Sequence, residues 1–177
     1  MTLTLCEIAR KTLEAHFSGN HNGLDKETKQ KFEDERACFV TLEKSGKLRG
    51  CIGSLEARQE LWRDVQENVI NAAFFDPRFY TVKKEELAKI KIEVSVLSKS
   101  KKLEFSGEKD LLNKLNHKMG IIIQKGHNSS TFLPQVWEQL PDKVEFLEHL
   151  SLKAGLDKDA WKSAEIFYYT VEFEKEE

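Results

Sequence analysis

The chain of 177 residues can form one domain with a full core, and its 40% hydrophobic and 33% charged residues exclude a disordered protein. Its 28 Lys and Arg against 30 Asp and Glu leave a formal charge of -2, without the basic excess typical of nucleic-acid binding. No apolar run approaches the roughly 20 residues of a membrane span, and the start has no signal-peptide pattern. Three cysteines without a Cys-x-x-Cys pair favour a reducing compartment, so we expect a cytoplasmic protein.

Apolar residues that recur every three or four positions predict helices, and alternation of apolar and polar residues predicts strands. The predicted helices cover residues 4–17, 59–75, 108–117 and 143–154, with a short helical piece at 83–88. The predicted strands cover residues 37–43, 48–55, 89–98, 120–124, 129–133 and 164–174. The polar stretch 21–31 is expected to be a surface connection.

Two of the predicted strand pairs are hairpins, and the elements do not repeat strictly as strand, helix and strand. This order favours an α+β fold, with a mainly antiparallel sheet and packed helices, over a doubly wound parallel sheet. No internal repeat or Pro/Gly linker divides the chain, so we expect a single domain over residues 1–177. The polar segments place a small lobe within about 20–36 and 99–118.

The segment Leu48–Gly53, which reads Leu-Arg-Gly-Cys-Ile-Gly, is the first candidate site. On a strand, Arg49 and Cys51 point to the same face, and a guanidinium near a thiol favours the reactive thiolate. Gly50 and Gly53 would let another backbone or a ligand come close. Cys51 is therefore a candidate nucleophile or ligand contact beside an anion-holding Arg49. The alternative is structural, because free cysteines often pack as small buried hydrophobes.

The register of the first hairpin bears on whether Cys51 forms a disulfide. A three-residue turn at 45–47 sets Thr41, and not Cys38, opposite Cys51. We therefore expect no bridge between Cys38 and Cys51.

The tetrapeptide Asp-Pro-Arg-Phe at 76–79 follows a predicted helix. Asp76 stands before a proline, where a carboxylate commonly accepts backbone N–H groups of a turn. Arg78 would then offer a planar donor fork to a carboxylate or phosphate of a ligand, or would pair internally to hold the loop. Glu93, on the polar side of the strand 89–98, is a candidate proton acceptor or orienting group; a solvated face explains it equally well.

Hydroxyl and amide groups cluster at 126–136, where Ser130 and Gln135 are candidate ligand contacts at the rim of an apolar pocket. The same residue types also serve local hydrogen bonding in hairpin loops. The sequence has no P-loop, no dinucleotide glycine fingerprint and no Gly-x-Ser-x-Gly elbow. Its five histidines form no cluster with zinc-ligand spacing, so a metal site is not expected and no cofactor can be named.

Five motifs, in order along the chain, together resemble the AMMECR domain family, which includes protein A of the AmmeMemoRadiSam system. They are Leu-Arg-Gly-Cys-Ile-Gly at 48–53, Asp-Pro-Arg-Phe at 76–79, Glu-Val-Ser-Val-Leu at 93–97, Phe-Leu-Pro-Gln-Val at 132–136 and Lys-Ala-Gly-Leu at 153–156. The resemblance spans roughly residues 4–173. One departure is that Tyr80 and Thr81 stand where members often have two prolines, so the geometry of this loop is not carried over.

The resemblance implies a larger and a smaller lobe with a cleft between them near Arg49 and Cys51. It also implies that these two residues gather with Asp76, Arg78 and Glu93, but it supplies no activity. Memo-like and radical-SAM proteins are the partners it implies. Two hypotheses follow: a small-ligand-binding protein or enzyme with its site at that cleft, or a non-catalytic adaptor or regulatory module. Nucleic-acid binding comes third and is disfavoured by the net charge.

Overall fold

The computed structural model describes residues 2–20 and 23–177. In it, the chain divides into two compact units, one made of Met1–Leu97 with Glu172–Glu177 and the other of Ser98–Val171. Each unit has its own hydrophobic core. All strand pairings recorded between the described strands are antiparallel, which confirms the expected α+β fold.

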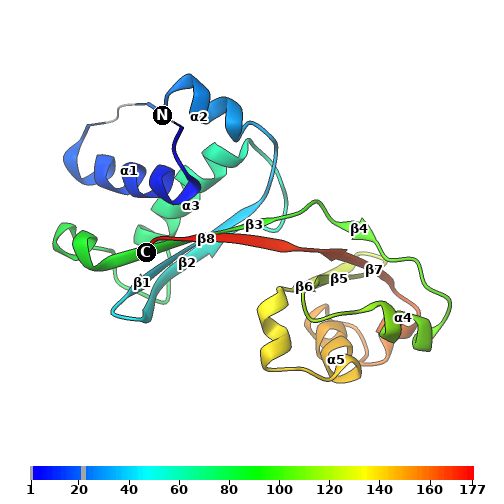
Figure 1. The fold of residues 1–177 in the computed structure, drawn as a ribbon. Helices are drawn as coiled ribbons and strands as arrows, with labels where there is room; N and C mark the ends of the chain where they lie inside the picture. Colours follow the sequence, from blue (N-terminus) through cyan, green and yellow to red (C-terminus); the bar gives the residue numbers. More distant parts are fainter. Residues whose placement is uncertain (1, 21–22) are drawn as a thin grey trace. The chain divides into compact units, whose positions relative to one another are not determined.

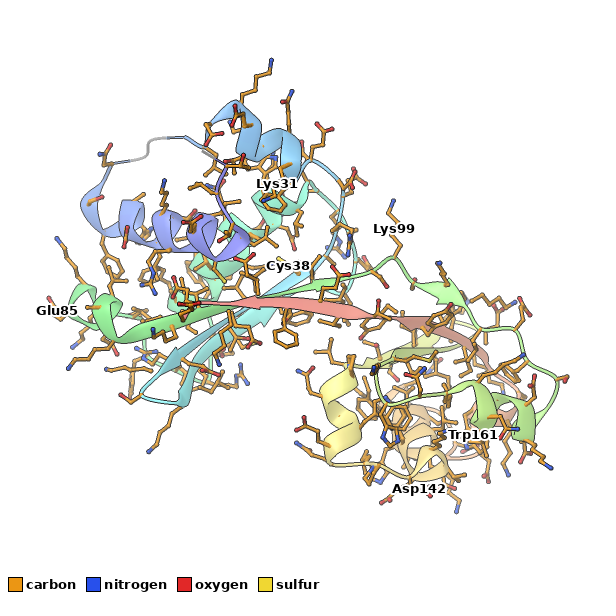
Figure 2. The ribbon with its side chains drawn as sticks, viewed as in Figure 1. Lys31, Cys38, Glu85, Lys99, Asp142 and Trp161 are labelled. Atoms are coloured by element: carbon orange, nitrogen blue, oxygen red, sulfur yellow. The ribbon has the colours of Figure 1, made fainter. Side chains whose placement is uncertain are left out.

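The two segments expected to form a small lobe fall in different units. Residues 23–36 belong to the first unit and residues 99–118 to the second, while positions 21 and 22 lie outside the described residues. Cys38 is buried in the core of the first unit and Trp161 in that of the second, and both are labelled among the side chains in Figure 2.

The first unit is a four-stranded sheet with strand order β2-β1-β3-β8 and helices on one of its faces (Figure 1). Its elements are α1 (Leu5–Ser18), α2 (Lys26–Lys31), β1 (Cys38–Lys44), β2 (Lys47–Gly53), α3 (Leu61–Phe74), the 3-10 helix η1 (Lys84–Lys89), β3 (Ile90–Leu97) and β8 (Val171–Lys175). The helix α1 begins with a capping box, in which the Thr4 hydroxyl accepts the Glu7 N–H and the Glu7 carboxylate accepts the Thr4 N–H.

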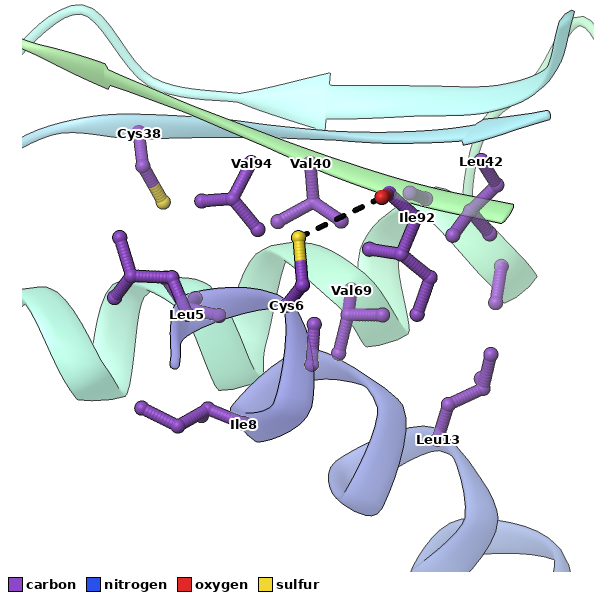
Figure 3. Close-up of a cluster of buried hydrophobic side chains, with 14 of the residues drawn as sticks. Leu5, Cys6, Ile8, Leu13, Cys38, Val40, Leu42, Val69, Ile92 and Val94 are labelled. Atoms are coloured by element: carbon purple, nitrogen blue, oxygen red, sulfur yellow. Dashed lines mark hydrogen bonds between the residues drawn. The ribbon is translucent and has the colours of Figure 1, made fainter. Parts of the chain in front are cut away.

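Alternation along the strands separates the two faces of this sheet. Val40, Leu42, Ile92 and Val94 are fully buried against α1 and α3, as the close-up in Figure 3 shows. The opposite face, called the outer face below, carries the side chains of alternate residues, which are only partly buried: Thr41, Cys51, Glu93 and Ser95. The predicted polar side of the third strand is therefore the outer face.

The β1–β2 hairpin reaches the predicted register by a different route. The turn has two residues, Ser45 and Gly46, both with positive φ, as a type I′ turn requires. A bulge in the ladder after Leu42 takes up the extra residue, so Thr41 still lies opposite Cys51. The prediction that Cys38 does not face Cys51 is confirmed, and all three cysteines are free thiols.

Gly50 lets α3 lie directly on β2. A Cβ atom at this position would stand 2.1 Å from the carbonyl oxygen of Ala72, which is backbone and has little room to move. The glycine expected to allow a close approach is therefore needed by a helix of the same chain.

The second unit is a four-stranded sheet with order β4-β7-β5-β6, packed on helices through a core that includes Phe146 and Trp161. Its elements are β4 (Lys101–Lys102), α4 (Glu108–Lys114), β5 (Gly120–Lys125), β6 (Asn128–Phe132), the 3-10 helix η2 (Pro134–Glu138), α5 (Lys143–Lys153), the 3-10 helix η3 (Ala160–Lys162) and β7 (Glu165–Tyr169). Asp142 caps α5 as predicted, accepting the Glu145 N–H at 2.9 Å.

The short elements β4, η2 and η3 were not predicted, and two further differences concern predicted segments. The single strand expected at 164–174 is broken at Thr170 into β7 and β8, which belong to different sheets, and Thr170 instead exchanges hydrogen bonds with Ser98. The stretch expected as a connection contains α2, which Asp25 caps and whose Thr28 is fully buried. A helix of six residues offers too few apolar positions for its period to be visible.

None of the helices in the described ranges is long and apolar enough to cross a membrane.

The replacement Gly50→Ala should lower the free energy of unfolding by about 1–3 kcal/mol, because the new methyl group overpacks the contact between β2 and α3. Urea denaturation measures this change. Gly23→Ala is the matched control, since a Cβ at Gly23 meets nothing within 4 Å. Equal stability of the two variants would show that α3 does not press on β2 at this point.

Candidate functional site

The carboxylate of Asp76 lies at the exposed edge of β2 and is almost fully buried, with 2% of its side chain accessible. It accepts the backbone N–H of Cys51 at 2.9 Å and that of Arg78 at 3.1 Å. It also accepts two guanidinium N–H groups of Arg78, at 3.0 and 2.7 Å. Arg78 completes the arrangement by donating to the carbonyl of Cys51 at 3.1 Å.

This Asp76–Arg78 clamp satisfies both backbone groups of Cys51 that point away from the sheet. Because β2 is an edge strand, these groups would otherwise be left for solvent or for another strand. The clamp takes the place of a neighbouring strand at one residue and holds Cys51 in position. It is the internal pairing that the sequence left open as one role of Arg78.

The clamp has a marked electrostatic signature. Hydrogen bonding from Arg78 holds the pKa of the Asp76 carboxyl well below its usual range, although burial opposes this shift. The same pairing raises the pKa of Arg78. Arg78 is half exposed, its Cζ lies 5.4 Å from the centre of the Phe79 ring, and its Nη1 donates to none of the described residues. Part of the guanidinium thus remains available to a ligand.

Cys51 stands in a row of polar side chains on the outer face. Its Sγ is 3.2 Å from the hydroxyl of Thr41, the residue opposite it on β1. Glu93 lies opposite Thr41 on the other side, on β3. Neighbouring strands are about 4.8 Å apart, so Cys51 and Glu93 are separated by about 10 Å. Glu93 is too far to take the thiol proton directly, and a ligand touching both must span that distance.

Among the described residues, Glu93 forms an ion pair with neither Arg49 nor Arg78. Its carboxylate lies 3.9 Å from the ammonium of Lys175, which is held more closely by Glu43 at 2.8 Å. The pairing reflects the position of β8 beside β3, which the sequence did not reveal.

Arg49 is engaged within the chain. Its guanidinium donates to the Glu86 carboxylate at 3.1 and 3.0 Å and to the carbonyls of Tyr80 and Thr81 at 2.8 and 3.3 Å. Hydrogen bonding from Arg49, with further help from Lys44, lowers the pKa of Glu86 to about 2. The anion that Arg49 holds in this structure is therefore a carboxylate of the protein. Together these contacts tie the loop after α3 to β2.

The three thiols occupy different environments. Cys6 and Cys38 are buried in the core of the first unit, and Cys6 lies 3.5 Å from the carbonyl of Ile92 (Figure 3). Burial raises the pKa of Cys6 to about 12 and also raises the pKa of Cys38. Cys51 is only partly buried. Of the three, it is the thiol best placed to meet a reagent or a ligand.

The remaining predicted contacts lie elsewhere in the fold. Gly53 is crowded by its own hairpin, since a Cβ there would stand 2.3 Å from the carbonyl oxygen of Cys38. Ser130 and Gln135 belong to the second unit. The hydroxyl of Ser130 donates to the carbonyl of Leu150 at 2.7 Å, and Gln135 is exposed on η2. A structural partner therefore accounts for Ser130.

Two contacts of the candidate site were not predicted from the sequence. They are Glu86 as the partner of Arg49 and Thr41 as the partner of the Cys51 thiol. Glu86 lies in a short 3-10 helix among other charged residues, where nothing distinguishes it from a solvated glutamate. Thr41 was recognised only as the residue opposite Cys51. Its hydroxyl could have been chosen from that register, because directly opposed side chains on one face lie close together.

Other features of the first unit do not point to a site. Two surface hollows lie along α1, and neither is lined by Cys51, Asp76 or Arg78. Within residues 2–20 and 23–177, no group of three or more His, Cys, Asp and Glu side chains is arranged to hold a metal ion.

Comparison with known proteins shows the family to which this chain belongs. The chain resembles the crystal structure of the uncharacterised protein PH0010 from Pyrococcus horikoshii with a TM-score of 0.79 and 32% identity, covering 98% of this chain and 90% of that one. Protein MK0488 of Methanopyrus kandleri is 40% identical over 98% of this chain and 87% of its own length. Protein NEQ441 of Nanoarchaeum equitans is 37% identical over 96% of both. The AMMECR1 family model matches residues 6–174, and the chain belongs to this family.

The replacement Asp76→Asn should lower the free energy of unfolding at neutral pH by about 1.5–3 kcal/mol, because charged hydrogen bonds within the clamp are lost. The folded-state pKa of Asp76 lies below its unfolded value of about 3.9. Its stabilisation is therefore complete above that pH and is lost as the pH falls through the folded pKa.

Urea denaturation of wild type and variant between neutral and strongly acidic pH measures this difference. The gap between them should be constant above about pH 5 and shrink below pH 4. Asp34→Asn, at an exposed carboxylate, should leave stability nearly unchanged. A gap that does not depend on pH would contradict the electrostatic role assigned to Asp76.

Proposed function

We propose that this protein binds a small molecule carrying a carboxylate or phosphate group on the outer face of the first unit, with Cys51 as a contact. The observation that supports this proposal is the clamp itself. It fixes the backbone of the partly exposed Cys51 and leaves Nη1 of the neighbouring Arg78 without a partner among the described residues. An oriented guanidinium beside an accessible thiol suits an anionic ligand.

The proposed roles follow from what each side chain already does. Arg78 meets the anionic group, because its guanidinium is half exposed. Arg49 positions the loop and does not contact the ligand, because Glu86 and two carbonyls occupy its donors. Cys51 and Thr41 contact the middle of the ligand, and Glu93 meets a group about 10 Å away across the strands. Partnership with Memo-like and radical-SAM proteins, implied by the family resemblance, belongs to the same proposal.

Catalysis at Cys51 would be an extension of ligand binding. The hydroxyl of Thr41 can donate to the sulfur and so stabilise a thiolate, or accept from it and so stabilise the thiol. Since Glu93 is too distant to remove the proton directly, a base supplied by the ligand or by water would be required. Binding is therefore the function that the geometry supports best.

In the folded protein, iodoacetamide should modify Cys51 at least about tenfold faster than Cys6 and Cys38, because the buried thiols react only after local opening. Peptide mass spectrometry gives the three rates in one sample, so the two buried cysteines are internal controls. A panel of small carboxylates and phosphates should contain compounds that slow the modification of Cys51 and raise the melting temperature.

In the variant Arg78→Lys, such a compound should protect Cys51 less and raise the melting temperature less. Lysine keeps the charge but lacks the planar set of N–H donors of the guanidinium. If Cys51 stays unreactive until the protein unfolds in urea, it is a packing residue and ligand binding at this face is wrong. If Cys51 reacts but no compound protects it, the ligand is not of the proposed chemistry.

A second candidate function, that of an adaptor, is favoured by two exposed aromatic side chains close to the clamp in the sequence. Tyr80 is 94% exposed and Phe75 is 69% exposed. Tyrosine and arginine are enriched among the residues that dominate binding at protein interfaces. With Arg78 between them along the chain, they form a candidate anchor for a partner protein.

If the adaptor function is right, Tyr80→Ala should weaken binding of the Memo-like protein from the same cell at least about tenfold, as expected for a hot-spot aromatic residue. Titration calorimetry measures the affinity. Phe173→Ala is the matched control, because Phe173 is also an exposed aromatic residue, at 73%, but lies on β8. An equal loss of affinity in both variants, or no binding of the Memo-like protein by the wild type, would contradict the role of Tyr80 as an anchor. Cys51→Ser should leave this affinity unchanged.

A further inference from the structure

The two sheets have four edge strands, and three of them are visibly blocked. An edge strand offers unpaired backbone groups to other chains unless it is short, charged or covered. In the first unit, β2 carries the clamp of Asp76 and Arg78, and β8 is charged at three of its five positions. In the second unit, β4 has only two residues, both lysines. The fourth edge strand, β6, has five residues and no charged side chain.

The register of the β5–β6 hairpin decides which backbone groups of β6 face outward. Gly126, with a φ of 61°, begins a two-residue turn, so Asn128 closes the hairpin with its partner on β5. Hydrogen-bonded and non-hydrogen-bonded pairs alternate along an antiparallel ladder, so Ser130 is the next residue bonded to β5. Ser129 and Thr131 therefore direct their backbone N–H and C=O groups away from the sheet.

The contacts of these two residues agree with this assignment. The carbonyl of Thr131 accepts the ammonium of Lys153 at 2.8 Å, a partner outside the sheet. No hydrogen bond recorded among the described residues engages the N–H of Thr131 or either backbone group of Ser129, and Ser129 is exposed. Three outward backbone groups of β6 are thus free to pair with an added strand.

The charge around β6 indicates what kind of strand it would accept. Residues 111–137 contain no Asp or Glu, although the whole chain has 30. His127 lies in the turn, the Lys125 ammonium is directed to the Ser163 hydroxyl at 2.9 Å, and Lys153 lies at the edge of β6 with its ammonium 4.9 Å from the centre of the Phe132 ring. Two copies of this edge would bring like charges together, which disfavours self-pairing.

We propose that β6 is a docking edge for an extended, acidic segment of a partner protein, which adds to the sheet as a fifth strand. Main-chain hydrogen bonds to Ser129 and Thr131 would supply affinity, and an acidic side chain meeting Lys153 would supply selectivity. This surface is separate from the site around Cys51 and does not depend on the function proposed there.

The test uses two synthetic probes, the acidic peptide Thr-Glu-Val-Glu-Val-Glu-Thr and its basic counterpart Thr-Lys-Val-Lys-Val-Lys-Thr, added to the full ¹⁵N-labelled chain. The acidic peptide should shift the backbone amide signals of Ser129 and Thr131 and slow their hydrogen exchange, while the basic peptide should do neither. The response should weaken as salt is added, because the charges involved are near the surface.

Ser129→Pro removes an outward N–H and leaves the ladder to β5 in place, since proline is tolerated in edge strands at such positions. Ser129→Pro should lower the affinity for the acidic peptide about tenfold or more. Ser129→Ala, which keeps the N–H, should bind the peptide like the wild type. Lys153→Glu should lower affinity for the acidic peptide and raise it for the basic one.

Several outcomes would overturn the proposal. They are equal binding of both peptides, protection of amides outside β6 in place of those in β6, unchanged affinity for the acidic peptide in both the Ser129→Pro and the Lys153→Glu variants, or no shift of the amide signals at millimolar acidic peptide. A wild-type dimer that Ser129→Pro makes monomeric would show that a second copy, and not an acidic partner, occupies the edge.

Discussion

The candidate site depends on the close approach of α3 to β2 at Gly50. Only a residue without a side chain lets the carbonyl of Ala72 come so near the strand. With α3 at this distance, the turn after its last residue brings Asp76 to the strand edge beside Cys51. The buried carboxylate then organises Arg78 and completes the edge. A packing constraint in the core thus sets the geometry of a polar group at the surface.

Two arginines play similar parts at this edge, and their exposure separates their roles. Arg49 is largely buried, with 16% of its side chain accessible, and its donors end on Glu86 and two loop carbonyls. Arg78 is 55% exposed and keeps one terminal nitrogen without a partner in the described chain. Arg49 thus holds the loop through its contacts within the chain, whereas the half-exposed guanidinium of Arg78 can also meet a ligand. The loop between α3 and η1 is thus held at both ends.

Much of the architecture was accessible from local pattern. The long helices α1, α3 and α5 and the strand β3 lie within a few residues of their predicted bounds because their apolar periods are long and regular. The register of Thr41 and Cys51 was also predicted, although a bulge and a two-residue turn produce it in place of a three-residue turn. The break at Thr170 was not predicted, because alternation continues through it while its hydrogen bonds pass to Ser98.

The α+β class, the two hairpins and the separation of Cys51 from Cys38 could be predicted, since they follow from periodicity and turn geometry over short stretches. The sequence also marked Arg49, Asp76 and Arg78 as residues of interest. Three features could be read only from the folded chain: which carboxylate each arginine meets, that Glu86 and Thr41 lie at the candidate site, and that β6 is an edge strand. A side chain's hydrogen-bond partner, and the neighbour of an edge strand, depend on segments that lie far apart in the chain, so local patterns do not reveal them.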